Sequence, residues 1–404
     1  MARLSLNDDD KEVRLWLTEQ AKAIGCTVTV DQMGNMFAVR PGKVSNVPPV
    51  IMGSHLDTQP TGGRYDGILG VTAGLEVLRT LHENGYETQG PLGLVNWTNE
   101  EGARFPITTV ASAVWAETLS LDAGWSCKEV SSLAAGPTPK TLKEELERIG
   151  FLGDVPASYR SQPIAAHFEL HIEQGPILEE NEEKIGVVTG AQAYSWYEIE
   201  VVGRDSHAGT TPLAVRKDAL LAAAKMIVES NEVARNAGGL ITTGIIDAYP
   251  GSINTLPKKV RFTLDARHPS DEKLAGMIAK CRELFDDIAK NGSAKGVDVE
   301  WTMLTENTAK HFHKDCIAAV EEAAVETTAP LSGKDGRKLW RYMTSGAGHD
   351  SCNTSKRCPT AMIFTTTRNG MSHTPDEYCS PEDCVLGAQV LLGAVMRYDA
   401  SRKL

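Results

Sequence analysis

Short apolar strands alternate with an amphipathic helix early in the chain, and this alternation most constrains the fold. Val50–Gly53 and Leu92–Trp97 are apolar runs of strand length, and Ile68–Glu83 between them has apolar side chains at helical spacing. Because a helix connects the two strands, they are expected to run parallel in one sheet. The sequence therefore predicts an α/β domain with a mostly parallel central sheet.

A second pattern fills the middle of the chain. Its apolar periodicity predicts a strand, a helix, two strands, a helix and a final strand, which is the split βαβ order (βαββαβ). The first of these helices is expected to begin with Thr211 as its N-cap and to carry Leu220, Ala224 and Ile227. We therefore predict a smaller α/β domain inserted into the first one. The expected ranges are 193–309 for the insertion, and 1–192 with 310–404 for the interrupted domain.

The composition argues against two classes of partner. The chain has 41 Lys and Arg against 53 Asp and Glu, and its formal net charge of −12 repels nucleic-acid phosphates and anionic membranes. The longest uncharged apolar run, Val385–Met396, is shorter than the roughly 20 residues that span a membrane. Eight scattered cysteines without a CxxC pair favour reduced thiols and a cytoplasmic location. The final Arg402-Lys403-Leu404 matches a Ser-Lys-Leu peroxisomal address only in part.

Polar side chains cluster where the predicted strands end. Because ligand sites of parallel sheets lie at the carboxyl ends of strands, these side chains are candidates for one common site. Three histidines with one Asp and one Glu could hold two divalent ions, with a carboxylate bridging them. The remaining Glu could act as general base, and Asp57 could orient an imidazole. The residues are His55, Asp57, Asp66, Glu100, Glu101, His171 and His373.

Spacing alone leaves a structural interpretation of the same residues open. A single histidine near a strand end is often only hydrogen-bonded, and an Asp before a helix, such as Asp66, is often its cap. A Glu-Glu pair is commonly solvated surface. None of the spacings forms a compact metal signature such as HExxH.

Six segments favour the metal site over the structural interpretation. Taken together and in their order along the chain, they resemble the hydantoinase/carbamoylase family of metal-dependent amidohydrolases, which belongs to the M20 peptidase-like superfamily. The resemblance covers nearly the whole chain. The segments are His55-Leu56-Asp57, Arg64-Tyr65-Asp66-Gly67, Trp97-Thr98-Asn99-Glu100-Glu101-Gly102-Ala103-Arg104-Phe105, His171-Ile172-Glu173-Gln174-Gly175-Pro176, Ser206-His207-Ala208-Gly209-Thr210-Thr211-Pro212 and Gly346-Ala347-Gly348-His349-Asp350.

The resemblance implies a metal-bearing catalytic domain and makes the insertion a lid or dimerisation domain, so that a homodimer is expected. It assigns two divalent ions to each chain, with Zn²⁺ favoured and Mn²⁺, Ni²⁺ or Co²⁺ as alternatives. It also makes Glu100 the general base and Asp66 the bridging carboxylate. The implied ligand sets are His55, Asp66 and His171 for one ion, and Asp66, Glu101 and His373 for the other.

The same resemblance implies a substrate-binding set. Arg267 offers a two-pronged clamp for a carboxylate, and His207 and Asn254 can donate hydrogen bonds to developing negative charge. From the residues alone, a surface ion pair with Asp265 is an equal alternative for Arg267, and a capping turn is an equal alternative for His207. The implied set is Gln174, His207, Asn254, Arg267 and His349.

The expected activity is hydrolysis of the ureido C–N bond of an N-carbamoyl amino acid, either an N-carbamoyl-L-amino acid or N-carbamoyl-β-alanine, to the amino acid, CO2 and ammonia. Such an enzyme acts on carbon–nitrogen bonds other than peptide bonds. The superfamily's peptidases usually carry a carboxylate at the position of His171, so this histidine favours ureido acids. The alternatives are an allantoate amidohydrolase, an aminoacylase or dipeptidase, and a non-catalytic binding protein on the same fold.

Overall fold

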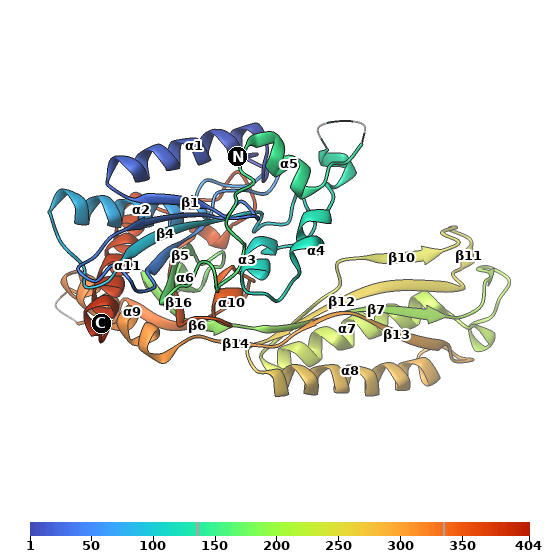
Figure 1. The fold of residues 1–404 in the computed structure, drawn as a ribbon. Helices are drawn as coiled ribbons and strands as arrows, with labels where there is room; N and C mark the ends of the chain where they lie inside the picture. The colour runs from blue at the N-terminus through green and yellow to red at the C-terminus, as the bar shows by residue number, and fades with distance from the viewer. Residues whose placement is uncertain (135, 137, 334–335) are drawn as a thin grey trace. The chain divides into compact units, whose positions relative to one another are not determined.

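The computed structural model divides into two compact units (Figure 1). The second unit covers the segment expected as an insertion, with slightly wider bounds. The units are Met1–Gly190 with His311–Leu404, and Ala191–Lys310. The structure describes residues 1–134, 136, 138–333 and 336–404.

The first unit is built on a nine-stranded sheet with the strand order β1-β2-β4-β3-β5-β16-β6-β14, and β15 also pairs with β6. The central strands β4, β3, β5 and β16 run parallel to one another. The prediction of an α/β fold with a mostly parallel central sheet is therefore confirmed. The strands are β1 (Thr27–Val30), β2 (Met36–Arg40), β3 (Val50–His55), β4 (Leu92–Trp97), β5 (Ala166–Ile172), β6 (Ile185–Ala191), β14 (Lys310–His311), β15 (Trp340–Ser345) and β16 (Thr360–Thr365).

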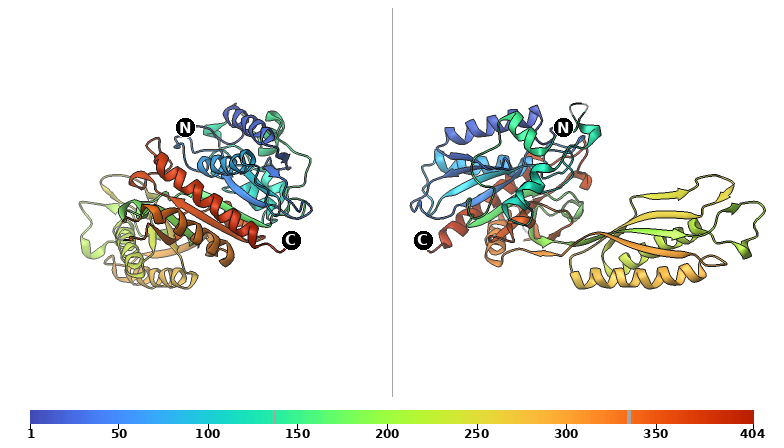
Figure 2. Two further views of the ribbon diagram at one scale, coloured as in Figure 1. Left: turned by 90° about the vertical axis from the view of Figure 1, so that its left-hand side faces the viewer. Right: turned by 45° about the vertical axis from the view of Figure 1, so that its right-hand side comes forward.

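Helices cover both faces of this sheet. On one face α11 packs against α2 and α9, as the views of Figure 2 also show for α9 and α11. On the other face Trp115 of α3 packs with Ile51 and Trp97. None of the helices in the described ranges is both long and apolar enough to cross a membrane. The helices are α1 (Asp8–Ala23), α2 (Ile68–Glu83), α3 (Val110–Trp115), α4 (Leu121–Ser126), α5 (Leu142–Ile149), α6 (Ile177–Glu180), α9 (Lys314–Thr328), α10 (Ser351–Thr354) and α11 (Pro381–Ser401).

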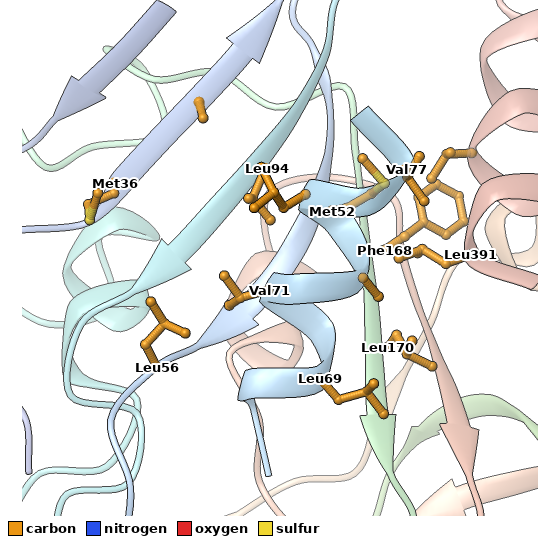
Figure 3. Packing of buried hydrophobic residues seen from close by; sticks show 14 of the residues in the cluster. Met36, Met52, Leu56, Leu69, Val71, Val77, Leu94, Phe168, Leu170 and Leu391 are labelled. Carbon is orange, nitrogen blue, oxygen red and sulfur yellow. The ribbon is translucent and has the colours of Figure 1, made fainter. Parts of the chain in front are cut away.

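The larger core lies between α2, α11 and the central strands (Figure 3). Met52 of β3 and Phe168 of β5 meet Val77 of α2 and Leu391 of α11, and all four side chains are buried. Burying a side chain of this size stabilises a fold by about 1.5–3 kcal/mol. This packing holds the carboxyl ends of the central strands in place, where the polar clusters of the sequence lie.

The second unit contains a five-stranded antiparallel sheet with the order β10-β12-β7-β13, in which β9 also pairs with β12. Two helices accompany this sheet, and a separate two-stranded ladder joins β8 to β11. The chain order agrees with the split βαβ pattern expected from the sequence. The elements are β7 (Ala193–Val202), β8 (Ser206–His207), α7 (Ala219–Ala237), β9 (Leu240–Thr242), β10 (Ile246–Tyr249), β11 (Thr255–Leu256), β12 (Lys259–His268), α8 (Asp271–Asn291) and β13 (Asp298–Asn307).

The start of α7 was predicted wrongly. The helix begins at Ala219, and its N-cap is Asp218, whose carboxylate accepts the N–H of Leu221 at 3.0 Å. Of the apolar residues expected on this helix, Leu220 and Ala224 are exposed, whereas Ile227 is half-buried against the core of the second unit. Since the first turns of this helix are apolar on nearly every side, periodicity could not select the buried face.

Candidate metal centre

The carboxyl ends of the parallel strands bring the predicted ligands together at one edge of the sheet. His55 is the last residue of β3 and lies opposite Trp97, the last residue of β4. His171 of β5 lies opposite Phe364 of β16. Strand β3 is two residues longer than the expected Val50–Gly53 run, so His55 belongs to the strand itself and not to the loop after it. The backbone pairing of the sheet therefore fixes where this side chain starts.

Asp66 stands between two groups of potential ligands. Its Oδ1 lies 3.4 Å from His55 Nε2 and 3.1 Å from His171 Nε2. Its Oδ2 lies 3.3 Å from His373 Nε2, and Glu101 Oε2 lies 3.4 Å from the same nitrogen. Within each group all ligand atoms are within 4.8 Å of one another. The two carboxylate oxygens of Asp66 thus face different groups, as a carboxylate that bridges two ions requires.

The hydrogen bonds at Nδ1 of the two buried histidines fit a metal at Nε2. His55 Nδ1 lies 2.9 Å from the carbonyl oxygen of Asp57, and His171 Nδ1 lies 2.8 Å from that of Ile172. A ring nitrogen can approach a carbonyl oxygen this closely only as a donor, so each neutral imidazole presents an Nε2 lone pair. His55 Nε2 is buried and has no hydrogen-bond partner among the described residues. Nitrogen lone pairs and carboxylate oxygens that converge in this way suit a divalent cation.

Unusual backbone conformations accompany the centre. His373, Gln174 and Asn99 are non-glycine residues with φ between 56° and 59°, in the left-handed region. Such conformations cost about 1–3 kcal/mol each and are typical of functional sites. At Gly67, where φ is +67°, a Cβ atom would lie 2.3 Å from His55 Nε2, so only glycine leaves room for that imidazole. The site is therefore built partly at the expense of local stability.

The Asp57 side chain holds the Glu100–Glu101 segment. Its Oδ1 accepts the N–H of Glu100 at 3.3 Å, and its Oδ2 accepts the N–H of Glu101 at 3.2 Å. Its carboxylate is 3.9 Å from His55 Nδ1, so the backbone carbonyl of Asp57 orients that ring more directly than the side chain does.

Glu100 lies beside the candidate ligands without belonging to either group. Its Oε2 is 3.6 Å from His55 Nε2, and its side chain is largely buried. Burial raises the pKa of the Glu100 carboxyl well above its ordinary value, against the opposing effect of His55. A carboxyl with a raised pKa can both accept and return a proton near neutral pH.

Two residues expected at the substrate, Gln174 and His349, also contact the candidate ligands. Gln174 Nε2 donates to Asp66 Oδ2 at 2.7 Å and to Ser372 Oγ at 3.2 Å. The His349 ring centroid is 4.6 Å from that of His171, and its Nε2 lies 2.9 Å from Ser345 Oγ. Burial lowers the pKa of His349 to about 3, so this imidazole is neutral.

Glu169 supports the centre and was missed in the sequence. Ser54 Oγ and Ser351 Oγ each donate to its carboxylate at 2.6 Å. Glu169 precedes His171 by two residues on β5, so both side chains point to the same face of the sheet. This spacing was a signal that could have identified Glu169, together with the presence of a charged residue inside an apolar strand.

In the second unit, His207 and Asn254 lie next to each other. His207 is on β8, and the N–H of the following residue donates to the Asn254 carbonyl at 2.8 Å. His207 Nδ1 accepts the N–H groups of Gly209 and Thr210 at 3.1 and 3.2 Å. The capping turn considered for His207 is therefore present. Because Nδ1 accepts, the proton of the neutral ring is on Nε2, which can donate to another group.

Arg267 lies on a different strand, β12, and forms the ion pair that was its alternative interpretation. Its Nε is 2.9 Å from Asp265 Oδ1, and its second terminal nitrogen is 2.7 Å from Asp265 Oδ2. The guanidinium also stacks on the Tyr194 ring at 5.6 Å. Both contacts hold the planar fork in a defined orientation.

Comparisons with known proteins place the chain among hydrolases and amidases of related families. The model of the family described as Peptidase family M20/M25/M40 matches residues 51–397. An N-carbamoyl-L-amino-acid amidohydrolase of Rhizobium meliloti is 39% identical over 98% of this chain and 90% of its own length. A ureidoglycolate hydrolase of Oryza sativa subsp. japonica is 32% identical over 98% of this chain and 80% of its own length. The crystal structure of an amidase of the hydantoinase/carbamoylase family from Burkholderia multivorans is 43% identical, with a TM-score of 0.91 over 100% of this chain and 93% of that one.

Proposed function

Because the chain belongs to peptidase family M20/M25/M40 and resembles hydantoinase/carbamoylase amidases over its whole length, we propose that it hydrolyses the ureido C–N bond of an N-carbamoyl amino acid. One water and one ureido acid give the free amino acid, CO2 and ammonia. The name of the Rhizobium meliloti relative supports this substrate class. The main support for the proposal comes from Asp66, because its two carboxylate oxygens face two separate ligand groups.

Two divalent ions would be held by these groups. His55 and His171 would share one ion with Asp66, and Glu101 and His373 would share the other with Asp66. Such a pair, when bound, polarises a carbonyl oxygen and makes water more acidic. Mixed imidazole and carboxylate ligands accept several ions, and Zn²⁺ is favoured over Mn²⁺, Ni²⁺ or Co²⁺.

Glu100 would move the proton. Its carboxylate would take a proton from the attacking water and return it to the leaving nitrogen. The raised pKa that burial produces suits both halves of this transfer. Asp57 would act indirectly, because it holds the backbone N–H of Glu100 and so fixes where the glutamate starts.

The residues expected at the substrate would have two kinds of role. Arg267 would clamp the carboxylate, and the Nε2–H of His207 together with Asn254 would stabilise negative charge on the ureido oxygen. Gln174 and His349 would act through the ligands they contact, Asp66 and His171.

Arg267→Lys is expected to separate substrates with a carboxylate from those without one. A lysine keeps the charge but loses the two-pronged geometry, so kcat/KM for an N-carbamoyl amino acid should fall about 10–100-fold. The matching carbamoyl amino amide, which lacks the carboxylate, should be much less affected. Steady-state kinetics on both compounds measures the difference. Equal losses on the two would remove Arg267 from carboxylate binding.

A panel of substrates tests the proposed activity. The chain, loaded separately with Zn²⁺, Mn²⁺, Ni²⁺ or Co²⁺, would be assayed for ammonia release from N-carbamoyl-L-amino acids, N-carbamoyl-β-alanine, ureidoglycolate and allantoate. Dipeptides and N-acyl amino acids would be followed by amine release. Ammonia release from N-carbamoyl amino acids supports the proposal. Turnover of dipeptides or N-acyl amino acids alone would assign an aminoacylase or dipeptidase instead.

The second unit would pair two copies of the chain into a homodimer. Leu220, Leu221 and Val228 of α7 are 37%, 46% and 61% exposed, so this helix leaves three large apolar side chains uncovered. Exposed apolar side chains grouped on one element are typical of interaction sites, and a second copy is the occupant we propose. The cytoplasmic location expected from the sequence stays a prediction.

Val228→Glu should shift the chain from dimer to monomer, because the interface would have to bury an unpaired charge. Glu229→Gln, at the next exposed position of α7, is the matched control and should leave the dimer intact. Sedimentation velocity over a concentration series measures both. A wild-type chain that sediments as a monomer throughout would contradict the proposal.

A further inference from the structure

Glu377 joins two loops of the candidate metal centre that are far apart in the chain. It follows His373 by four residues, and its side chain is buried. Its Oε1 accepts the N–H of Tyr65 at 2.9 Å and the N–H of Asp66 at 3.1 Å, across separations of 312 and 311 residues. One carboxylate oxygen therefore fixes the backbone that carries the shared ligand.

The other oxygen of Glu377 reaches the same ligand through a serine. Ser372 Oγ lies 3.0 Å from Glu377 Oε2 and also 3.0 Å from Asp66 Oδ2. Gln174 Nε2 donates to Ser372 Oγ, so the serine proton is directed toward the carboxylates. Asp66 is thus held at its backbone by Glu377 and at its side chain by Ser372 and Gln174.

The backbone opposite Glu377 is shaped to receive it. A Cβ atom at Gly63 would lie 2.1 Å from Glu377 Oε1 and 2.4 Å from Glu377 Cβ. Both distances are far below a van der Waals contact. Only glycine at position 63 therefore lets the carboxylate approach the N–H groups of Tyr65 and Asp66 this closely.

We propose that Glu377 is a positioning residue that sets the orientation of Asp66 between its two ligand groups. The inference rests on the proposed two-ion site. Because Asp66 contributes one oxygen to each group, a displacement of Asp66 would lower the affinity of both groups for their ions at once. Loss of a group that holds a ligand typically lowers metal affinity about 10–100-fold.

Zn²⁺ affinity, measured by competition with a chromophoric chelator, tests the proposal without an assay of activity. Glu377→Ala should bind both ions about 10–100-fold more weakly than the wild type. Glu377→Gln, which keeps an acceptor for the two N–H groups, should recover part of this loss. Asp376→Ala removes the neighbouring exposed carboxylate and should match the wild type.

Two further measurements separate positioning from general destabilisation. Hydrogen exchange of the amides of Tyr65 and Asp66 should quicken in Glu377→Ala, while exchange in the central strands stays slow. Gly63→Ala leaves the carboxylate in the chain but excludes it from its place, so it should weaken Zn²⁺ binding like Glu377→Ala. The double variant should be little worse than either single variant, because both remove the same contact.

Unchanged Zn²⁺ affinity in Glu377→Ala, or fully additive losses in the double variant, would overturn the proposal. These results are independent of the substrate question. A wild-type chain that binds Zn²⁺ but hydrolyses no ureido acid would contradict the proposed function and leave the role of Glu377 standing. An active chain whose Glu377→Ala variant keeps its metal would do the reverse.

Discussion

Glu100→Gln is expected to lower kcat by about 10²–10⁴-fold while metal content and substrate affinity stay close to those of the wild type. The amide preserves the shape of the side chain but cannot accept a proton. Glu100 belongs to neither ligand group, so its replacement should leave both groups complete. Single-turnover rates, substrate binding and elemental analysis on the same preparation measure the three quantities.

The adjacent Glu101→Gln variant is the matched control. Glu101 is a member of the group with Asp66 and His373, so its replacement should lower the metal content as well as kcat. Two neighbouring glutamates with the same substitution would then differ in metal content. If Glu100→Gln instead lost metal in proportion to activity, Glu100 would be a ligand and the proton transfer would need another residue.

Asp66→Asn is expected to weaken the binding of both ions together and to abolish most turnover. An amide supplies only one oxygen and no negative charge, whereas the two groups each use one carboxylate oxygen. The loss of affinity should exceed the roughly 10–100-fold that follows removal of a group outside the ligand set. Chelator competition gives the affinity for each ion, and thermal unfolding without metal checks that the variant is folded.

His373→Ala is the comparison for this prediction. His373 belongs to one group only, so this variant should weaken the binding of one ion and leave the affinity for the other largely unchanged. Retention of one tightly bound ion by Asp66→Asn would show that the carboxylate is not shared, and the two groups would then have to be independent.

Much of the first unit could be predicted because its signals are local. Helix α2 and strand β4 have the bounds that the apolar periodicity gave, Ile68–Glu83 and Leu92–Trp97. Periodicity works here because each element buries one face or both against the same core. It failed at α7, where apolar residues surround the first turns and only packing on the sheet selects Ala222, Ala223 and Met226 as the buried residues.

The kinds of side chain that stand at the strand ends could be predicted from the local pattern. His55, Glu101 and His171 are set by residue identity and strand position, since parallel strands place their carboxyl ends at one edge. The resemblance to a known family added roles that spacing left open. Nothing in the local pattern distinguished Glu377 from an exposed acidic residue such as Asp376.

How these side chains share their contacts depends on the packing of segments that are far apart in the chain. The contact of Glu377 with the Asp66 backbone joins residues 311 apart in the chain. The division of the two Asp66 oxygens and the close approach at Gly63 likewise depend on segments that are distant in sequence. The physical reason is that hydrogen bonds and steric fit act over a few ångströms in space, whatever the separation in the chain. A sequence pattern reports the periodicity of one element, whereas these contacts exist only after several elements have packed together.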